Sequence, residues 1–119
     1  MPPISPSSIP VPGKPVRGSK SGDPIMALFD LLGRRWAMGI LWTLCKTGPC
    51  TFRELQANCG SISPTVLNTR LKELRESLLI THAENGYLPT PMGQELYELL
   101  LPIGGWSGQW AQVLVGEKE

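Results

Sequence analysis

Residues 51–89 read TFRELQANCGSISPTVLNTRLKELRESLLITHAENGYLP, and this stretch decides the fold. It contains two signals for the start of a helix. Thr51 and Glu54 form a T-x-x-E capping box, in which a hydroxyl and a carboxylate satisfy exposed amides at a helix start. Ser63-Pro64 is the second signal, because proline is favoured in the first helical turn. With a glycine between them, the sequence predicts two short helices joined by a tight turn.

The second of these helices, predicted over residues 63–77, has two chemically different sides. One side is a straight seam of leucines: Leu67, Leu71, Leu74 and Leu78. The other side holds small polar and charged residues: Thr65, Asn68, Thr69, Lys72 and Glu76. Apolar residues at this spacing mark the face that a helix buries. We therefore expect the leucine seam to be buried and the polar side to face solvent or a partner.

A β-hairpin is predicted directly after this helix. Residues 79–84 and Tyr87-Leu88 are short strand-like runs, and Asn85-Gly86 separates them. Asn-Gly between such runs is the strongest local hairpin signal, because both residues tolerate positive φ. The order helix, turn, helix, hairpin predicts a mostly α protein with a small β-hairpin wing, which is the winged helix-turn-helix arrangement.

Two further helices are predicted upstream of this stretch. Asp23-Pro24 is a cap followed by proline, and Gly33 ends the helix that it opens. A second helix is expected from about Arg34 to Lys46 and is apolar on most sides, as in a helix at the centre of a small domain. Residues 1–22 are rich in proline, glycine and serine and lack hydrophobic periodicity. A flexible tail is expected there, with the domain over residues 23–115.

Downstream, Thr90-Pro91 starts another helix by the same rule. Pro102 and Gly104-Gly105 are expected to kink or break it. On both sides of that point the apolar side chains make more surface than a small core can cover: Leu99, Leu100, Ile103, Trp106 and Trp110. We interpret them as a dimer interface. The alternative is that the tryptophans pack within the chain against the second helix.

Charge is unevenly distributed, although the formal net charge is only +1. Residues 34–75 carry seven basic and two acidic residues, whereas residues 76–119 carry six acidic residues and one lysine. A local basic region matters more to a polyanionic partner than the total charge does. Taken alone, the charge pattern is explained equally well by an ordinary solvated surface without a binding role.

Composition excludes several classes of protein. No apolar run approaches the roughly 20 residues needed to span a bilayer, so no membrane partner is expected. The N-terminus lacks the apolar region of a secretory signal. Three cysteines at no familiar spacing argue against a disulfide framework. The expected location is the cytoplasm, with reduced thiols.

The polar side of the second helix suits double-stranded DNA. In a helix-turn-helix the first helix braces the second, whose N-terminal turns enter the major groove. Asparagine can pair with adenine through two hydrogen bonds, and a helix N-terminus attracts phosphate. The residues expected to contact DNA are Arg53, Ser63, Thr65, Asn68, Thr69, Arg70 and Lys72. The alternative, an ordinary solvated face, is favoured for one isolated helix but not for the complete arrangement.

The cysteines are candidates for a metal site and for a redox role. Cys45, Cys50 and Cys59 with His82 fit no common zinc spacing, so neither a metal nor a cofactor is expected. Cys50 is the candidate redox residue, because it precedes a helix start, where the helix dipole favours a thiolate. A quiet, partly exposed cysteine is the alternative. With one histidine and no nucleophile elbow or phosphate loop, an enzyme is not expected.

Residues 23–111 resemble the HxlR-type regulators, a branch of the winged-helix proteins related to MarR. The matching stretches, in the family's order, are residues 31–36, 40–41, 48–49, 52–55, 62–67, 70–74 and 79–80, Tyr87, Thr90, Gly93 and Trp110. The resemblance implies a homodimer built from the first and last helices, which adds Ile25, Leu28 and Phe29 to the expected interface. It also implies a pseudo-palindromic operator and a response to redox or small electrophilic signals.

Three features depart from the family pattern. Asp23-Pro24 stands where the family often has a cysteine before proline, so thiol sensing at that position is not expected. The wing holds Glu84 and no Lys or Arg, so its contact with the minor groove is expected to be weak. Leu78 stands where a glycine is usual after the recognition helix.

We therefore predict a sequence-specific transcriptional regulator, a repressor or an activator, with a small-molecule or redox signal as its expected effector. A second hypothesis is a winged-helix module for protein–protein interaction without DNA contact, which the short acidic wing favours. A third is a ligand-gated regulator with a pocket at the dimer interface, lined by Trp36, Trp42, Trp106 or Trp110. Aromatic residues in such places belong more often to a core than to a ligand site.

Overall fold

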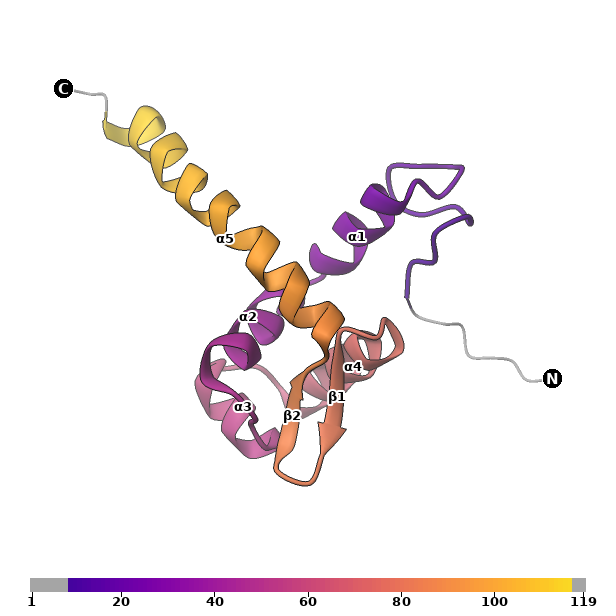
Figure 1. Ribbon diagram of the computed structural model, residues 1–119, viewed down its shortest axis with the longest axis vertical. Coiled ribbons are helices and arrows are strands. Elements are labelled where there is room, and N and C mark those ends of the chain that lie inside the picture. The colour runs from indigo at the N-terminus through magenta and orange to yellow at the C-terminus, as the bar shows by residue number, and fades with distance from the viewer. Residues whose placement is uncertain (1–8, 117–119) are drawn as a thin grey trace.

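The computed structural model describes residues 9–116. In chain order, its elements are α1 (Pro24–Leu32), α2 (Ala37–Thr47), α3 (Phe52–Asn58), α4 (Pro64–Glu76), β1 (Ile80–Ala83), β2 (Gly86–Pro89), α5 (Pro91–Ala111) and a π-helical turn, η1 (Gln112–Gly116) (Figure 1). The described chain is mostly helical and carries one two-stranded antiparallel hairpin. The predicted fold class is confirmed.

The predicted helix starts are confirmed by their capping hydrogen bonds. The Asp23 carboxylate accepts from the Ile25 amide, and the Ser63 hydroxyl accepts from the Val66 amide. Thr51 and Glu54 make both bonds of the capping box, at 3.1 and 2.9 Å. Each cap satisfies an amide that the helix itself leaves unpaired.

The second helix begins three residues later than predicted. Residues 33–36 form a turn, in which the Ala37 amide donates to the Arg34 carbonyl. Trp36 has φ 77°, a left-handed conformation that cannot continue a helix. The apolar pattern of α2 extends into this turn, so hydropathy alone did not show the boundary.

The core lies where α2, α3 and α4 meet. Its fully buried side chains are Ile40, Leu41, Leu44, Leu55, Leu67, Leu71 and Leu74. Three of the four seam leucines of α4 are therefore buried as predicted. Leu78 is the exception: it follows the helix end, has φ 65° and is 69% exposed. The seam stops there because the chain reverses direction to enter β1.

The wing forms as predicted, but its turn is shifted by one residue. Ala83 pairs with Gly86, so Glu84 and Asn85 occupy the turn instead of Asn85 and Gly86. Among residues 83–86, only Gly86 has positive φ, at 122°. A β-carbon at Gly86 would collide with the Cys50 carbonyl, because Cys50 and Tyr87 exchange backbone hydrogen bonds of 3.0 and 2.7 Å. This bridge fastens the wing to the start of α3.

The last helix is continuous, so the expected break at Pro102 does not occur. α5 runs through Pro102 and both glycines to Ala111 and projects from the body of the molecule (Figure 1). Proline removes one hydrogen bond, here to the Glu98 carbonyl. Residues 101–106 are exposed, so water can hydrate that carbonyl and the helix need not end.

The N-terminal segment folds back beside α1. The Gly13 amide donates to the Gly22 carbonyl, and Val16 and Ser19 form an isolated bridge. Arg17 donates its amide to Asp30 of α1. The division into a flexible tail over residues 1–22 and a domain over 23–115 stays a prediction, and residues 1–8 lie outside the described part.

Candidate nucleic-acid interface

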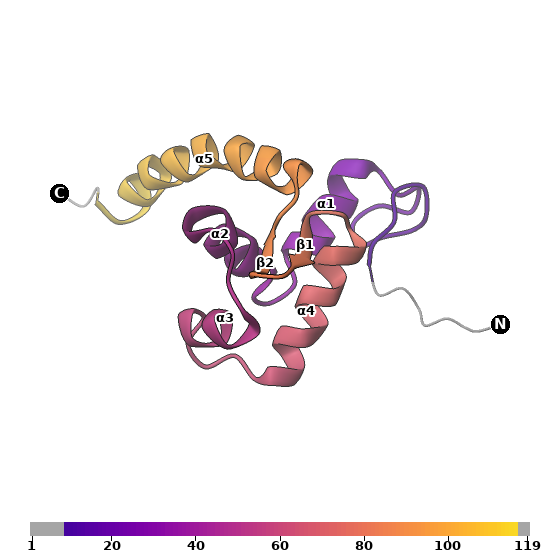
Figure 2. The same cartoon turned by 60° about the horizontal axis from the view of Figure 1, so that its bottom comes forward.

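Helices α3 and α4 form the pair expected of a helix-turn-helix. They lie together on one side of the molecule, joined by a short turn, with the N-terminus of α4 at the outer edge (Figure 2). The Gln56 side chain of α3 donates to the Ile62 carbonyl in that turn. Leu55 and Leu67 are completely buried between the elements. α3 therefore braces α4 as the sequence predicted.

The polar side of α4 is open to solvent. The residues expected to contact base edges and phosphates are exposed: Ser63, Thr65, Asn68, Thr69 and Lys72. Thr69 donates its hydroxyl to the Thr65 carbonyl, and the Asn68 side chain makes no hydrogen bond to residues 9–116. Between residues 63 and 72 the sequence has no acidic side chain. The exposed surface is therefore polar and basic, as a duplex requires.

The two arginines that are expected to contact DNA differ in their bonding within the chain. Arg53 is exposed on α3. Arg70 is held within the chain, because its Nε donates to the Arg35 carbonyl at 2.7 Å and its guanidinium pairs with Glu73 at 3.2 Å. Its side chain is only 20% exposed. A phosphate contact by Arg70 has to compete with these bonds.

Glu73 is a site residue that sequence reasoning missed. It is 4% exposed and accepts from Arg34 at 3.0 Å as well as from Arg70. Its carboxylate thereby ties the middle of α4 to the turn between α1 and α2. Glu73 lies next to the leucine seam, which is the one signal in the sequence that could have shown its burial. A carboxylate in that place needs cationic partners.

The wing offers little positive charge. His82 and Tyr87 stack face to face across the hairpin, with ring centroids 4.0 Å apart. Tyr87 is buried, whereas Thr81, His82 and Glu84 are exposed. The stack stiffens the wing, and the absence of Lys and Arg from its sequence limits its attraction to phosphate.

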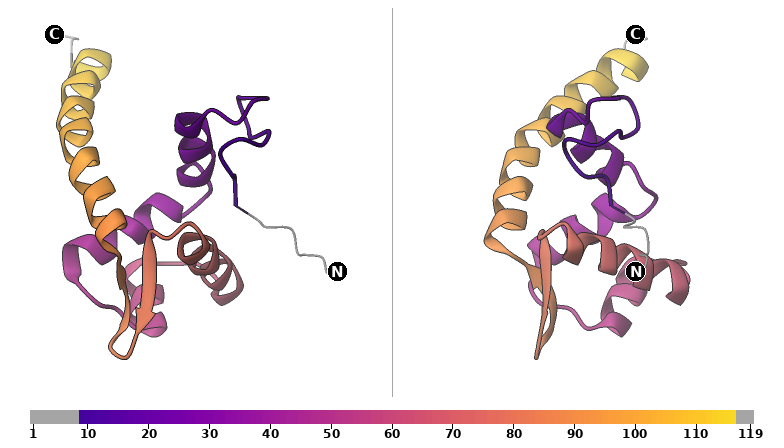
Figure 3. Two further views of the ribbon diagram at one scale, coloured as in Figure 1. Left: turned by 45° about the vertical axis from the view of Figure 1, so that its right-hand side comes forward. Right: turned by 90° about the vertical axis from the view of Figure 1, so that its right-hand side faces the viewer.

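A second surface is apolar and uncovered. α1 and α5 diverge from the body of the molecule (Figure 3) and enclose a groove of about 530 Å³. Most of the predicted dimer residues are at least half exposed: Ile25, Phe29, Leu99, Ile103, Trp106 and Trp110. Leu28 is half-buried in the groove. Trp106 and Trp110 stack on each other on exposed α5, so they do not pack against α2.

The four tryptophans do not line one pocket within the described chain. Trp42 packs edge-on against Tyr97, with ring centroids 4.9 Å apart. The Arg35 guanidinium lies 5.2 Å from the ring of Trp36. These two rings belong to packing inside the chain, and the other two lie on the projecting part of α5.

The Cys50 thiol is less accessible than expected. Cys50 is 4% exposed instead of partly exposed, and its sulfur contacts the Thr47 hydroxyl at 3.3 Å. The bridge to Tyr87 requires this burial. Burial also raises the pKa of the Cys45 thiol, with a smaller contribution from Glu98. It likewise raises the pKa of the Cys59 thiol, with a smaller contribution from Cys50.

Within residues 9–116, no group of three His, Cys, Asp or Glu side chains could hold a metal ion. Within the same residues, no helix is both long enough and apolar enough to cross a membrane.

Comparison with known proteins identifies the fold with a family of regulators. The model of the HxlR-like helix-turn-helix family matches residues 31–114. A regulator of the helix-turn-helix type from Halalkalibacterium halodurans is 31% identical over 83 residues, which are 67% of this chain and 74% of that protein. The transcriptional regulator YodB of Bacillus subtilis is 29% identical over 91 residues, 71% of this chain and 80% of YodB. These relatives are transcriptional regulators, not enzymes.

Solved structures agree with these matches. The crystal structure of quinone-bound YodB superposes with a TM-score of 0.68 at 30% identity, and the match covers 72% of this chain and 97% of that one. A possible HxlR family transcription factor from Thermoplasma volcanium gives a TM-score of 0.65 at 24% identity, with 76% of this chain and 86% of that one covered. The latter is evidence for the shared fold alone.

Proposed function

This chain belongs to the HxlR-like helix-turn-helix family of transcriptional regulators, and on that premise we propose that it acts as a homodimer on a pseudo-palindromic operator, which α4 reads in the major groove. One observation supports this most: the side of α4 from Ser63 to Lys72 is exposed, polar and free of acid. A surface of that kind suits a duplex and has no role in the core.

The residues of α3 and α4 that are expected to contact DNA divide by role. Asn68 is positioned to read a base, because asparagine forms two hydrogen bonds with adenine and this side chain has no competing bond within residues 9–116. Ser63, Thr65 and Thr69 permit several contacts to bases or phosphates. Arg53 and Lys72 bind phosphate. Arg70 positions α4 through Glu73, which changes the role that its charge alone suggested.

The dimer is supported by the open groove and by the shape of the chain. The radius of gyration is 16.0 Å, whereas a compact domain of this length has one of about 13.5 Å. α5 contributes to the difference, because it projects from the body with its apolar side uncovered. The same helix of a second copy would cover the α1–α5 groove and the stacked tryptophans. Two copies of α4 would then face successive turns of a duplex.

The experiment is a titration of the duplex upstream of the protein's own coding sequence, followed by fluorescence anisotropy over a series of salt concentrations. The logarithm of affinity is expected to fall linearly with the logarithm of salt concentration, because Lys and Arg displace counterions from phosphates. Asn68→Ala should reduce the preference for this duplex over scrambled DNA by about 1–3 kcal/mol. Equal binding of both duplexes by the wild-type protein would contradict the proposal.

Two finer points remain proposals. Because YodB has been crystallised with a quinone, we propose that a small molecule is also the effector here. Oxidation of Cys50 is the less favoured signal, since its thiol is buried. The hypothesis of a protein–protein module retains the short acidic wing as support, but the acid-free face of α4 favours DNA.

A further inference from the structure

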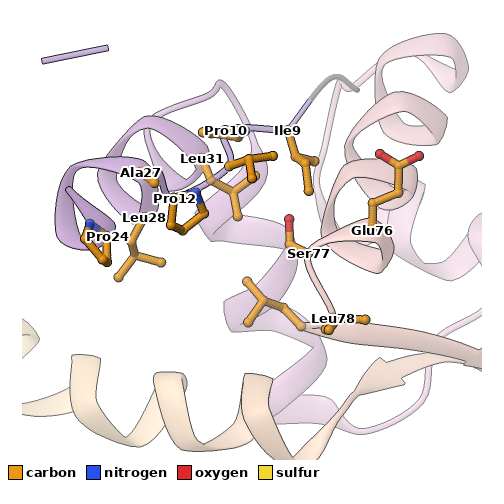
Figure 4. A pocket seen from close by; sticks show the side chains of 12 residues that line it. Ile9, Pro10, Pro12, Pro24, Ala27, Leu28, Leu31, Glu76, Ser77 and Leu78 are labelled. Carbon is orange, nitrogen blue, oxygen red and sulfur yellow. The ribbon is translucent and has the colours of Figure 1, made fainter. Parts of the chain in front are cut away.

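A second cavity has a volume of about 310 Å³ and shares only Leu28 with the lining of the α1–α5 groove. Its walls are residues 9–12, one side of α1 and residues 76–79 at the end of α4 (Figure 4). Three segments that are distant in sequence therefore meet around one space. Two of them belong to elements that the proposed function uses, the dimer helix and the recognition helix.

The lining is apolar except at one end. Pro12, Leu28 and Leu31 lie on one side of the cavity, and Ser77 and Leu78 lie on the other (Figure 4). Ser77 and Glu76 are the two polar residues of the wall. The Ser77 hydroxyl donates to the Glu73 carbonyl at 2.8 Å, so its oxygen is left to accept. The Glu76 side chain makes no hydrogen bond or ion pair to residues 9–116, and its carboxylate also accepts.

The volume of the cavity and the chemistry of its lining together define the kind of ligand that fits. The volume is roughly twice the 150 Å³ of an apolar protein cavity that holds benzene, so two fused rings can enter. Carbon walls favour an uncharged body. The acceptors at the polar end favour a hydrogen-bond donor on the ligand, because such a donor can bond to the Ser77 hydroxyl or the Glu76 carboxylate.

We propose that this cavity binds a small, uncharged, two-ring molecule that carries one hydroxyl or similar donor, and that the ligand acts as an effector. The binding site does not depend on DNA binding, whereas its regulatory role rests on the proposed function. An occupant contacts α1 and the end of α4 at once. It therefore changes DNA affinity to the extent that it fits one arrangement of these helices better than another.

The first part of the test measures binding in the absence of DNA. Naphthol is titrated into the full-length protein by calorimetry, with naphthalene as the probe that lacks the donor. The wild-type protein should bind one naphthol per chain. Pro12→Asp, which places a charge in the wall, should weaken binding at least about tenfold. Pro15→Asp is the matched control, because Pro15 belongs to the same segment but not to the wall.

A third variant tests the polar end. Ser77→Ala should weaken the binding of naphthol and leave the binding of naphthalene unchanged. Circular dichroism and thermal unfolding establish that each variant is folded. Absence of saturable binding by the wild-type protein overturns the proposal. So does equal binding by the Pro12 and Pro15 variants, since the probe then binds elsewhere, for example in the α1–α5 groove.

The second part measures DNA affinity with and without saturating naphthol. The affinity of the wild-type protein should change at least about threefold, and that of Pro12→Asp should not change. Binding of naphthol without any change in DNA affinity overturns the effector role. A protein that binds naphthol but no DNA contradicts the proposed function and leaves the binding site established.

Discussion

Leu78 has a backbone conformation that leucine rarely adopts. At φ 65° its β-carbon crowds the neighbouring carbonyl, which costs about 1–2 kcal/mol relative to glycine. The residue is tolerated because Thr90 bonds to this reversal, its hydroxyl donating to the Leu78 carbonyl at 2.7 Å and its amide to the Leu79 carbonyl at 3.0 Å. The start of α5 thus holds the end of α4 in place.

Substituting this residue tests the strain. Leu78→Gly should raise the free energy of unfolding by up to about 1 kcal/mol, because relief of strain exceeds the extra entropy of the unfolded chain. Leu78→Val should lower it, since a branched β-carbon suits positive φ even less. Urea denaturation of both variants is the measurement, and a glycine variant less stable than the valine variant would show that φ is not the deciding quantity.

A second prediction concerns the reactivity of individual cysteine residues. Burial raises the pKa of both Cys45 and Cys59, so the reactive thiolate is scarcer at pH 7 than in a free cysteine. Alkylation by iodoacetamide should therefore be slow in the native protein and should still accelerate as the pH rises beyond 9. Mass spectrometry follows the reaction, with the urea-unfolded chain as the control for full reactivity. Rapid modification of native Cys50 at pH 7 would instead revive the redox hypothesis.

Among the elements, α4 owes its position to the bonds of Glu73 as well as to the leucine seam. Two arginines from different segments neutralise this buried carboxylate. Glu73→Gln should lower the free energy of unfolding by about 2–3 kcal/mol, because two cations lose their partner. Glu76→Gln, on the exposed side of the same helix, should change it by less than about 0.5 kcal/mol. If urea denaturation shows the two variants to be equally stable, the ion pairs do not position α4.

The elements also show what the sequence could predict. Thr51, Ser63 and Thr90 act within three residues of themselves, so their caps and the helices they begin were predictable. The turn at Trp36 and the burial of Glu73 depend on contacts between distant segments, which local patterns do not contain. The effect of Pro102 was mispredicted for a related reason. The free-energy cost of a proline inside a helix depends on whether water can reach the carbonyl that loses its partner, and the exposure of α5 was not known from the sequence.

The candidate site was predictable to a similar extent. Helical periodicity alone placed Asn68 and Lys72 on the open side of α4. The charge of Arg70 suggested a phosphate contact, but a partner 35 residues away along the chain engages it. Cys50 stands next to a helix start, as the sequence says, yet the wing covers it through Tyr87.

For the whole molecule, the apolar sides of α1 and α5 predict assembly. Wild-type protein should sediment as a dimer at micromolar concentration. Ile103→Asp should weaken the dimer at least about 100-fold, because a charge replaces roughly 3 kcal/mol of apolar burial. Met92→Asp makes the same change at an exposed residue outside the groove and should leave the dimer intact. A wild-type monomer, or a dimer unaffected by Ile103→Asp, would refute this interface.

The central claim is that the exposed side of α4 lies against DNA. The most direct test compares Asn68→Glu with Gln94→Glu, two variants with the same change of charge, one on that side and one at the start of α5. Anisotropy with the upstream duplex at about 150 mM salt should show affinity lowered at least about 100-fold by Asn68→Glu, because a carboxylate then faces the phosphates. Gln94→Glu should stay within about twofold of wild type. Equal affinity of the two variants would contradict the account.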